Sequence, residues 1–187
     1  MTEPIGVLVM AYGTAAGPDD VERYYTDIRG GRAPTPEHLQ ELKNRYAAIG
    51  NRFPLLDITR AQAAGLQREL DATEPGRFRT YLGMKHSAPF IRDGVAEMKG
   101  EGIRRALGLV MAPHWSGMSV ETYGAAARSA IENEGADIEF DHVRQWYAQP
   151  SFIELLAWRV ASAVESLPGP VRGGAEVVFS AHSLPQR

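Results

Sequence analysis

The sequence contains no cysteine among its 187 residues. This absence excludes disulfide bonds, thiolate zinc sites and iron–sulfur cluster ligation within this stretch. No apolar run approaches the roughly 18 residues that a membrane-spanning helix needs. The amino terminus also lacks the charged segment and the small-residue cleavage site of a secretory signal. We therefore expect a cytoplasmic protein with no membrane partner.

Basic residues are too few to indicate a nucleic-acid partner, because the net charge is −3 and the isoelectric point is about 6.0. Neither a G-x-G-x-x-G motif nor a Walker loop follows the first apolar run, so dinucleotide and nucleoside triphosphate binding have little support. No serine or cysteine lies in a nucleophile-elbow pattern. The hydrophobic share of 44% is that of an ordinary globular protein.

Four short apolar segments each lead to a residue that can do chemistry. The pairs are residues 5–11 with Tyr12, 78–84 with His86, 106–112 with His114, and 176–181 with His182. Helical patterns follow the first three, which predicts an α/β fold, an open parallel sheet with helices on both faces of the Rossmann or flavodoxin-like kind. Because ligands bind beyond the carboxyl ends of such strands, we expect these four side chains to share one ligand-binding edge.

A helical insertion is predicted between the first two strands, at about residues 19–72, where three helical patterns occur instead of one. We assign residues 1–145 to a first domain that includes this insertion and a polar edge strand at 136–143. Residues 146–187 are predicted to form a crossing helix, a linker at 168–174 and the first strand of a second, incomplete domain. Without its sheet, we expect the segment after about residue 169 to be disordered or to pair elsewhere.

The predicted edge combines flat aromatic rings with cations and imidazoles. Aromatic rings beside arginines suit a large flat ligand with peripheral carboxylates. The rings can pack on its faces, and arginine binds a carboxylate through two charge-assisted hydrogen bonds. Imidazole without thiolate suits a divalent metal that must be released again. For Tyr24, Tyr25 and Tyr46, a role in the core stays open, and His38 and His142 are expected to be structural or solvated.

Six stretches resemble the ferrochelatases, and in particular the bacterial type that inserts Fe²⁺ into coproporphyrin III. They read GVLVMAYGT, VERYYTDIRGGR, LKNRYAAIG, GMKHSAPF, VMAPHWSGMSVETY and FSAHSLP, and they follow the family's order over nearly the whole chain. The resemblance implies coproporphyrin III and Fe²⁺ as substrates, a role in haem biosynthesis, and no tightly bound cofactor.

The resemblance also implies roles for individual residues. His182 would be the metal-site imidazole and would accept pyrrole protons, while Tyr12 would face the metal from the opposite side of the macrocycle. Contacts to the porphyrin, chiefly its propionates, are implied for Arg29, Arg45, Tyr46 and Tyr123. Phe53 is also implied as a porphyrin-binding residue, but the chain departs from the family there, because a small serine is usual at this position. The hydroxyl contact is lost, and a contact through the backbone stays open. Tyr25, Lys85 and His86 would lie near the pocket and support the residues that contact the porphyrin, and a role on the path of the iron stays open for His86.

In the family, a second α/β domain supplies a carboxylate partner for the equivalent of His182, and that residue is absent up to Arg187. The sequence is therefore interpreted as a fragment or the product of an early stop. Three other functions stay open: a porphyrin-binding module without turnover, a chelatase that rebuilds its cleft by homodimerisation, and, more weakly, a flavodoxin-like electron carrier.

Overall fold

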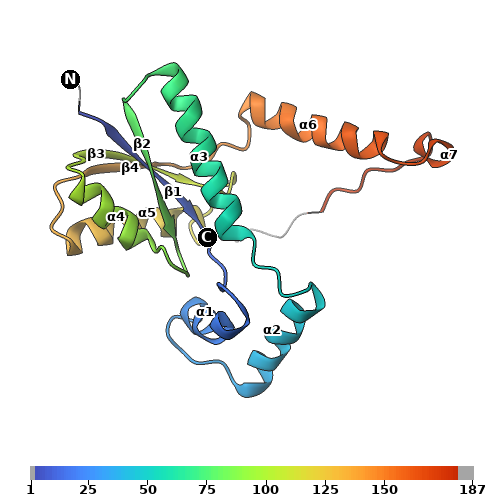
Figure 1. Cartoon of the computed structure of the whole chain (residues 1–187), viewed down its shortest axis with the longest axis horizontal. Coiled ribbons are helices and arrows are strands. Elements are labelled where there is room, and N and C mark those ends of the chain that lie inside the picture. Colours follow the sequence, from blue (N-terminus) through green and yellow to red (C-terminus); the bar gives the residue numbers. More distant parts are fainter. Residues whose placement is uncertain (1–2, 181–187) are drawn as a thin grey trace.

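A parallel four-stranded sheet forms the centre of the computed structural model, which describes residues 3–180 (Figure 1). The strand order is β2-β1-β3-β4, and every neighbouring pair is parallel. The strands are β1 (Ile5–Ala11), β2 (Phe78–Met84), β3 (Arg105–Val110) and β4 (Glu139–Val143). The predicted α/β class and the edge position of the polar fourth strand are confirmed.

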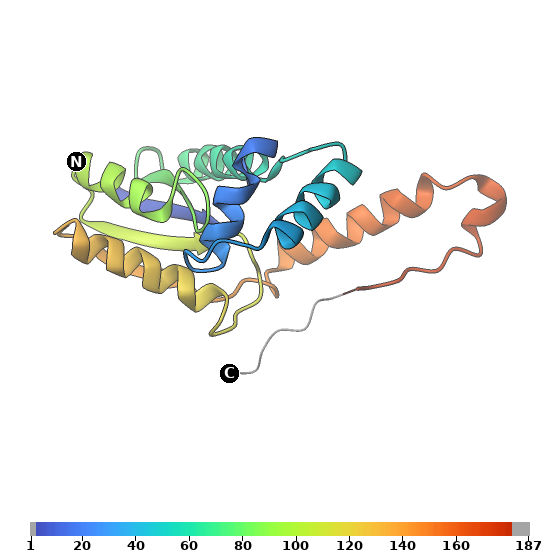
Figure 2. The same cartoon turned by 90° about the horizontal axis from the view of Figure 1, so that it is seen from below.

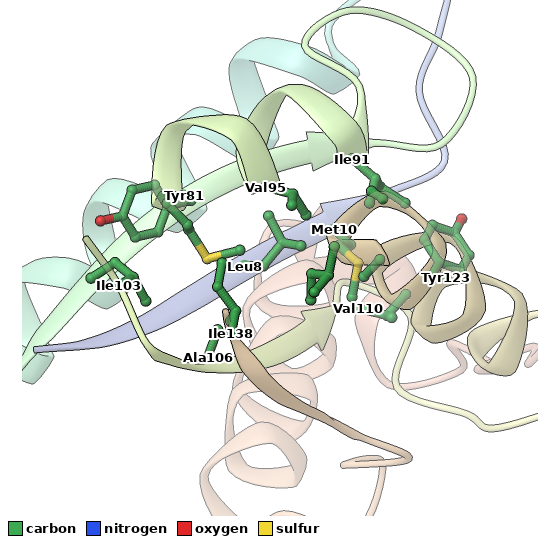
Figure 3. Close-up of a cluster of buried hydrophobic side chains, with 14 of the residues drawn as sticks. Leu8, Met10, Tyr81, Ile91, Val95, Ile103, Ala106, Val110, Tyr123 and Ile138 are labelled. Carbon is green, nitrogen blue, oxygen red and sulfur yellow. The ribbon is translucent and has the colours of Figure 1, made fainter. Parts of the chain in front are cut away.

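Helices cover both faces of the sheet. The covering helices are α3 (Leu55–Thr73), α4 (Ile91–Gly100) and α5 (Val120–Asn133). The other helices of the described residues are α1 (Val21–Ile28), α2 (Pro36–Ala48), α6 (Pro150–Glu165), α7 (Gly169–Arg172) and a short 3-10 helix, η1 (Pro18–Asp20). One face of β1 packs through Val7 and Val9 against Ala63 of α3. The opposite face packs through Leu8 and Met10 against α4 and α5 (Figure 3).

The central position of β1 explains its composition. Leu8, Val9 and Met10 are fully buried, because β2 and β3 flank the strand and helices cover both of its faces. A strand in this environment gains free energy from apolar side chains on both sides, which is why it reads as a continuous apolar run.

Between β1 and β2 the chain forms η1, α1, α2 and α3. Helix α2 begins at Pro36 after Thr35, whose Oγ1 accepts a hydrogen bond from the His38 backbone N–H at 3.4 Å. Helices α1 and α2 lie beyond one end of the sheet, whereas α3 returns along its face (Figures 1 and 2). The insertion therefore adds a helical wall next to the predicted ligand edge.

The carboxyl-terminal part differs from the prediction. Residues 173–180 contain no strand, and Val178 and Phe179 are almost fully exposed. An apolar run becomes a strand only where a neighbouring strand can pair with its backbone, and none lies beside it in the described region. The predicted linker contains the four-residue helix α7, which begins after Pro168. The division into domains at about residue 146 stays a prediction.

Helix α6 leads away from the sheet (Figure 2) and leaves several apolar side chains exposed, including Trp158 at 64%. Within residues 3–180, none of the helices has the length and apolar character that crossing a bilayer requires.

Candidate ligand-binding edge

Tyr12 and His86 lie side by side where β1 and β2 end. The parallel ladder continues past both strands, because the backbone N–H of Lys85 donates to Ala11 O at 2.9 Å and that of His86 donates to Tyr12 O at 3.0 Å. The two rings contact each other with centroids 4.6 Å apart. Burial, followed by the nearby Asp27 carboxylate, raises the pKa of the Tyr12 phenol, so this group stays protonated at neutral pH.

The insertion contributes a carboxylate to this edge. Asp27 of α1 places Oδ1 2.6 Å from Nδ1 of His86, whose side chain is only 14% exposed. A second contact also joins α1 to the segment after β2, where the Arg23 guanidinium lies 5.9 Å from the ring centroid of Phe90. These contacts hold the helical wall against the sheet edge.

The turn after Tyr12 requires glycine. Gly13 has a φ of +96°, and a Cβ at this position would lie 2.6 Å from Ser87 Oγ. The close approach lets the Thr14 backbone N–H donate to Ser87 Oγ at 3.2 Å. Gly13 therefore allows the loops after β1 and β2 to meet at the residues that follow Tyr12 and His86.

Tyr46 and Phe53 form a second aromatic pair, with ring centroids 4.6 Å apart. The Tyr46 hydroxyl lies 3.4 Å from Thr14 Oγ1, which links α2 to the loop after β1. Phe53 also lines a cavity of about 490 Å³ together with Ser87 and Phe90. A cavity of this size is in the range of small-molecule sites. The aromatic ring at position 53 makes this wall apolar, where a serine would offer a hydroxyl.

The arginines predicted to contact propionates lie on the insertion. Arg29 directly follows α1, and its guanidinium lies 5.5 Å from the ring centroid of Tyr25. Its buried Nε has no hydrogen-bond partner within the described part of the chain. Arg45 of α2 pairs with Glu41 and keeps 72% of its side chain exposed. Together with Tyr25 and Tyr46, Arg45 lines a cavity of about 300 Å³ between α1 and α2.

The half-buried Lys85, just after β2, packs on the buried ring of Tyr123 from α5. The Lys85 ammonium donates to Thr122 Oγ1 at 2.7 Å and lies 5.2 Å from the ring centroid of Tyr123. Burial lowers the pKa of Lys85 and raises that of Tyr123. Tyr123 belongs to the core and is only 5% exposed. Its predicted contact with a propionate stays a prediction, as does the role of Lys85.

The other histidines are separate from the Tyr12–His86 pair. His114 follows β3 at the same edge of the sheet, is exposed and stacks on Tyr147 with centroids 5.1 Å apart. His38 is exposed on α2, and His142 is buried between β4 and α5. His182 lies outside the described residues. Within residues 3–180, no three histidine or acidic side chains gather in a way that could hold a metal ion.

Sequence reasoning missed Asp27 and Ser87. Both act through partners far away in the chain, since Asp27 reaches His86 across 59 positions and Ser87 reaches Thr14 across 73. The helical pattern around Asp27 indicates a surface turn of a helix and carries no sign of the histidine that it contacts.

The chain thus combines a parallel α/β sheet with a helical insertion that brings an Asp–His pair next to Tyr12 at the carboxyl edge, where proteins of this fold class bind their ligands. Residues 4–187 match the family model described as Ferrochelatase. The chain belongs to the ferrochelatase family.

Individual relatives agree with this assignment. The chain is 44% identical over 188 residues to the coproporphyrin III ferrochelatase of Listeria innocua, with 100% of the chain and 60% of the relative covered. It is 45% identical over 184 residues to the coproporphyrin III ferrochelatase of Bacillus subtilis, with 98% of the chain and 59% of the relative covered. A ferrochelatase of Herpetosiphon aurantiacus is 42% identical over 187 residues, with 100% and 61% covered. The chain thus spans about 60% of the length of these relatives.

Proposed function

We propose that the chain acts in a ferrochelatase that inserts Fe²⁺ into coproporphyrin III in haem biosynthesis. The observation that carries the proposal is the meeting of Tyr12 and His86 at the sheet edge, beside an insertion that presents Arg29 and Arg45. The family membership and the names of two of the relatives support the same substrate.

The insertion supplies the groups that a porphyrin carboxylate needs. In this proposal Arg29 and Arg45 bind propionates, and Tyr46 adds a hydroxyl next to Arg45. Phe53 provides an apolar surface without a side-chain hydrogen bond, and Tyr25 supports the Arg29 guanidinium. Contacts at the periphery of the macrocycle can then offset the strain of bending it, which tilts the pyrrole lone pairs toward the incoming ion.

The metal step is assigned to His182, with Tyr12 on the other side of the macrocycle. Two pyrrole N–H bonds must break as the iron–nitrogen bonds form, so two protons leave the ring for each Fe²⁺ that enters. A neutral imidazole at position 182 can release the ion to the ring and take up one of these protons, which requires a pKa near the working pH, while the other proton passes to water. Fe²⁺ is a substrate in this scheme, and no resident cofactor is invoked.

Absorbance titration with coproporphyrin III, followed by an Fe²⁺ insertion assay, tests the proposal. We expect the chain to bind coproporphyrin III more tightly than protoporphyrin, which has two propionates in place of four. Where insertion occurs, His182→Ala should slow it by roughly 10²- to 10⁴-fold, the usual contribution of a general base. Tyr12→Phe tests the phenol, and Tyr147→Phe serves as its control because that ring is 42% exposed and contacts His114 instead.

The outcomes separate the functions that the sequence left open. Binding without insertion identifies a porphyrin-binding module, and insertion only at concentrations where sedimentation detects a dimer identifies a chelatase completed by a second copy. Failure to bind any porphyrin contradicts the proposal. Unchanged insertion by His182→Ala contradicts the assignment of the metal step alone.

A further inference from the structure

The contact between Asp27 and His86 determines which nitrogen of the imidazole carries its proton. Asp27 Oδ1 and His86 Nδ1 are 2.6 Å apart, and the aspartate carboxylate can only accept. In the neutral imidazole the proton therefore lies on Nδ1, and Nε2 keeps its lone pair. No other side-chain hydrogen bond of Asp27 or His86 occurs in the described part of the chain.

This tautomer restricts what His86 can recognise. An unprotonated Nε2 accepts a hydrogen bond and cannot donate one to a carboxylate. A free-base porphyrin carries both kinds of group, since its inner pyrrole N–H groups are donors and its propionates are acceptors. His86 in the tautomer selected by Asp27 is thus matched to the centre of the macrocycle and not to its periphery.

We propose that Asp27 is a positioning residue that holds His86 in the Nδ1–H tautomer, so that Nε2 accepts a hydrogen bond from a pyrrole N–H of the bound free-base porphyrin. The inference rests on the proposed function, because it takes a porphyrin as the ligand of this edge. It also assigns a second task to α1, which would contribute a carboxylate through His86 in addition to the cation at Arg29.

The surroundings of His86 support a fixed ring. Its backbone N–H is held by Tyr12 O at 3.0 Å, and its ring contacts the Tyr12 ring on one side. The side chain is only 14% exposed, whereas Asp27 is 37% exposed. A ring constrained at its backbone, its face and Nδ1 has lost most of its rotational freedom before a ligand arrives, which is how a binding group is preorganised.

Nitrogen-15 NMR of the ligand-free chain tests the tautomer directly. At about pH 8, above the ordinary pKa of histidine, we expect the His86 signals of a protonated Nδ1 and an unprotonated Nε2. Asp27→Ala should move the signals toward the Nε2–H form, and Asp27→Asn should retain the Nδ1–H form because its amide oxygen can still accept. Asp137→Ala, which removes an exposed carboxylate paired with Arg104, should leave them unchanged. A protonated Nε2 in the unsubstituted chain would overturn the proposal.

Porphyrin binding tests the recognition step. Copper(II) coproporphyrin III is a suitable probe, because it keeps all four propionates, has no pyrrole N–H and takes axial ligands only weakly. Asp27→Ala should weaken binding of free-base coproporphyrin III by about fivefold, as expected for one hydrogen bond, and change the affinity for the copper complex by less than about twofold. Asp27→Asn should restore most of the difference, and Asp137→Ala should change neither affinity.

The two proposals can fail separately. If Asp27→Ala lost the same affinity for free-base coproporphyrin III and for its copper complex, Asp27 would only maintain the fold of the edge. If it lost affinity for neither, His86 would not contact the ring nitrogens. Each of these results overturns the inference and leaves the proposed function intact. If the unsubstituted chain binds neither porphyrin, the proposed function fails, and the recognition step fails with it even where NMR finds the Nδ1–H tautomer.

Discussion

The imidazole of His142 packs directly on the backbone of Gly124, so that a Cβ at position 124 would lie 2.7 Å from Cε1 of the ring. His142 is buried on β4, and Gly124 lies in the interior of α5. The missing side chain allows α5 to approach the edge strand closely enough to bury the histidine between them.

Gly124→Ala is expected to destabilise the chain, although alanine favours a helix. Helix propensity would contribute about 1 kcal/mol of stabilisation, and forcing a methyl group against the buried ring would cost about 1–3 kcal/mol. Gly65→Ala in α3 is the matched control, since its Cβ would meet nothing closer than 3.7 Å. Urea unfolding should place Gly124→Ala about 1–3 kcal/mol below Gly65→Ala. Equal stability of the two variants would contradict the proposed packing.

Gly13→Ala should damage both stability and the ligand edge. A non-glycine residue at a φ of +96° is strained, and the added methyl group would collide with Ser87 Oγ. We expect a loss of about 1–3 kcal/mol and weaker binding of coproporphyrin III. Gly17→Ala is the control, because Gly17 is extended and a methyl group added there would have no neighbouring atom within 4 Å. Thermal unfolding and absorbance titration measure the two effects, and a Gly13 variant that matches the Gly17 variant in both would refute the argument.

Three buried tyrosines are expected to make the folded chain less stable at alkaline pH. Burial raises the pKa values of Tyr24, Tyr81 and Tyr123 above the ordinary value of about 10, and a hydrogen bond to Glu101 adds to the effect at Tyr81. Above about pH 10 the unfolded chain releases these phenol protons while the folded chain keeps them, so stability falls as pH rises. Each tyrosine should contribute a slope of about 1.4 kcal/mol per pH unit in this window.

Tyrosine-to-phenylalanine variants check this dependence. Urea unfolding between about pH 8 and pH 11, a range that spans the ordinary tyrosine pKa, should show a shallower decline for Tyr123→Phe than for the unsubstituted chain. Tyr147→Phe, at an exposed position, should leave the slope unchanged. The interpretation fails if the Tyr123 variant declines as steeply as the unsubstituted chain.

Glu41→Gln is predicted to tighten coproporphyrin III binding. Glu41 pairs with Arg45 in the absence of ligand and therefore competes with a propionate for the same guanidinium. An exposed ion pair is worth about 0–1 kcal/mol, so the affinity should rise by up to about fivefold, with a smaller gain at high salt. Glu37→Gln on the same helix controls for the loss of charge. If both variants bind equally, the pairing with Arg45 does not compete with the ligand.

The sequence predicted the sheet well, because each strand is an apolar segment that can be recognised from its own residues. The bounds of β1 and β2 match the apolar segments that end at Tyr12 and shortly before His86, and the parallel arrangement brings those two residues together at one edge. The apolar segment at 176–180 was expected to be a strand and is not one, because a strand depends on a partner that its own residues do not specify.

The site was less predictable than the sheet, because most of its contacts join residues that are far apart in the chain. Arg29 and Arg45 could be named from the resemblance, but their partners Tyr25 and Glu41 depend on helix-face geometry. Asp27 had no local signal at all, since its significance arises only when α1 folds over the end of β2. The position of His182 relative to Tyr12 stays a prediction, as do the cytoplasmic location and the absence of a tightly bound cofactor.

The placement of the helical insertion between two adjacent strands has a consequence for engineering. One continuous stretch, residues 3–90, contains β1, the helical insertion, β2 and the loop after β2, in which Ser87 accepts a hydrogen bond from Thr14. Exchange of that block between relatives would therefore move the whole helical insertion in one segment, together with its contacts to the loops after β1 and β2. If the proposed function holds, such an exchange between relatives should carry with it the arginines assigned to propionate binding, Arg29 and Arg45.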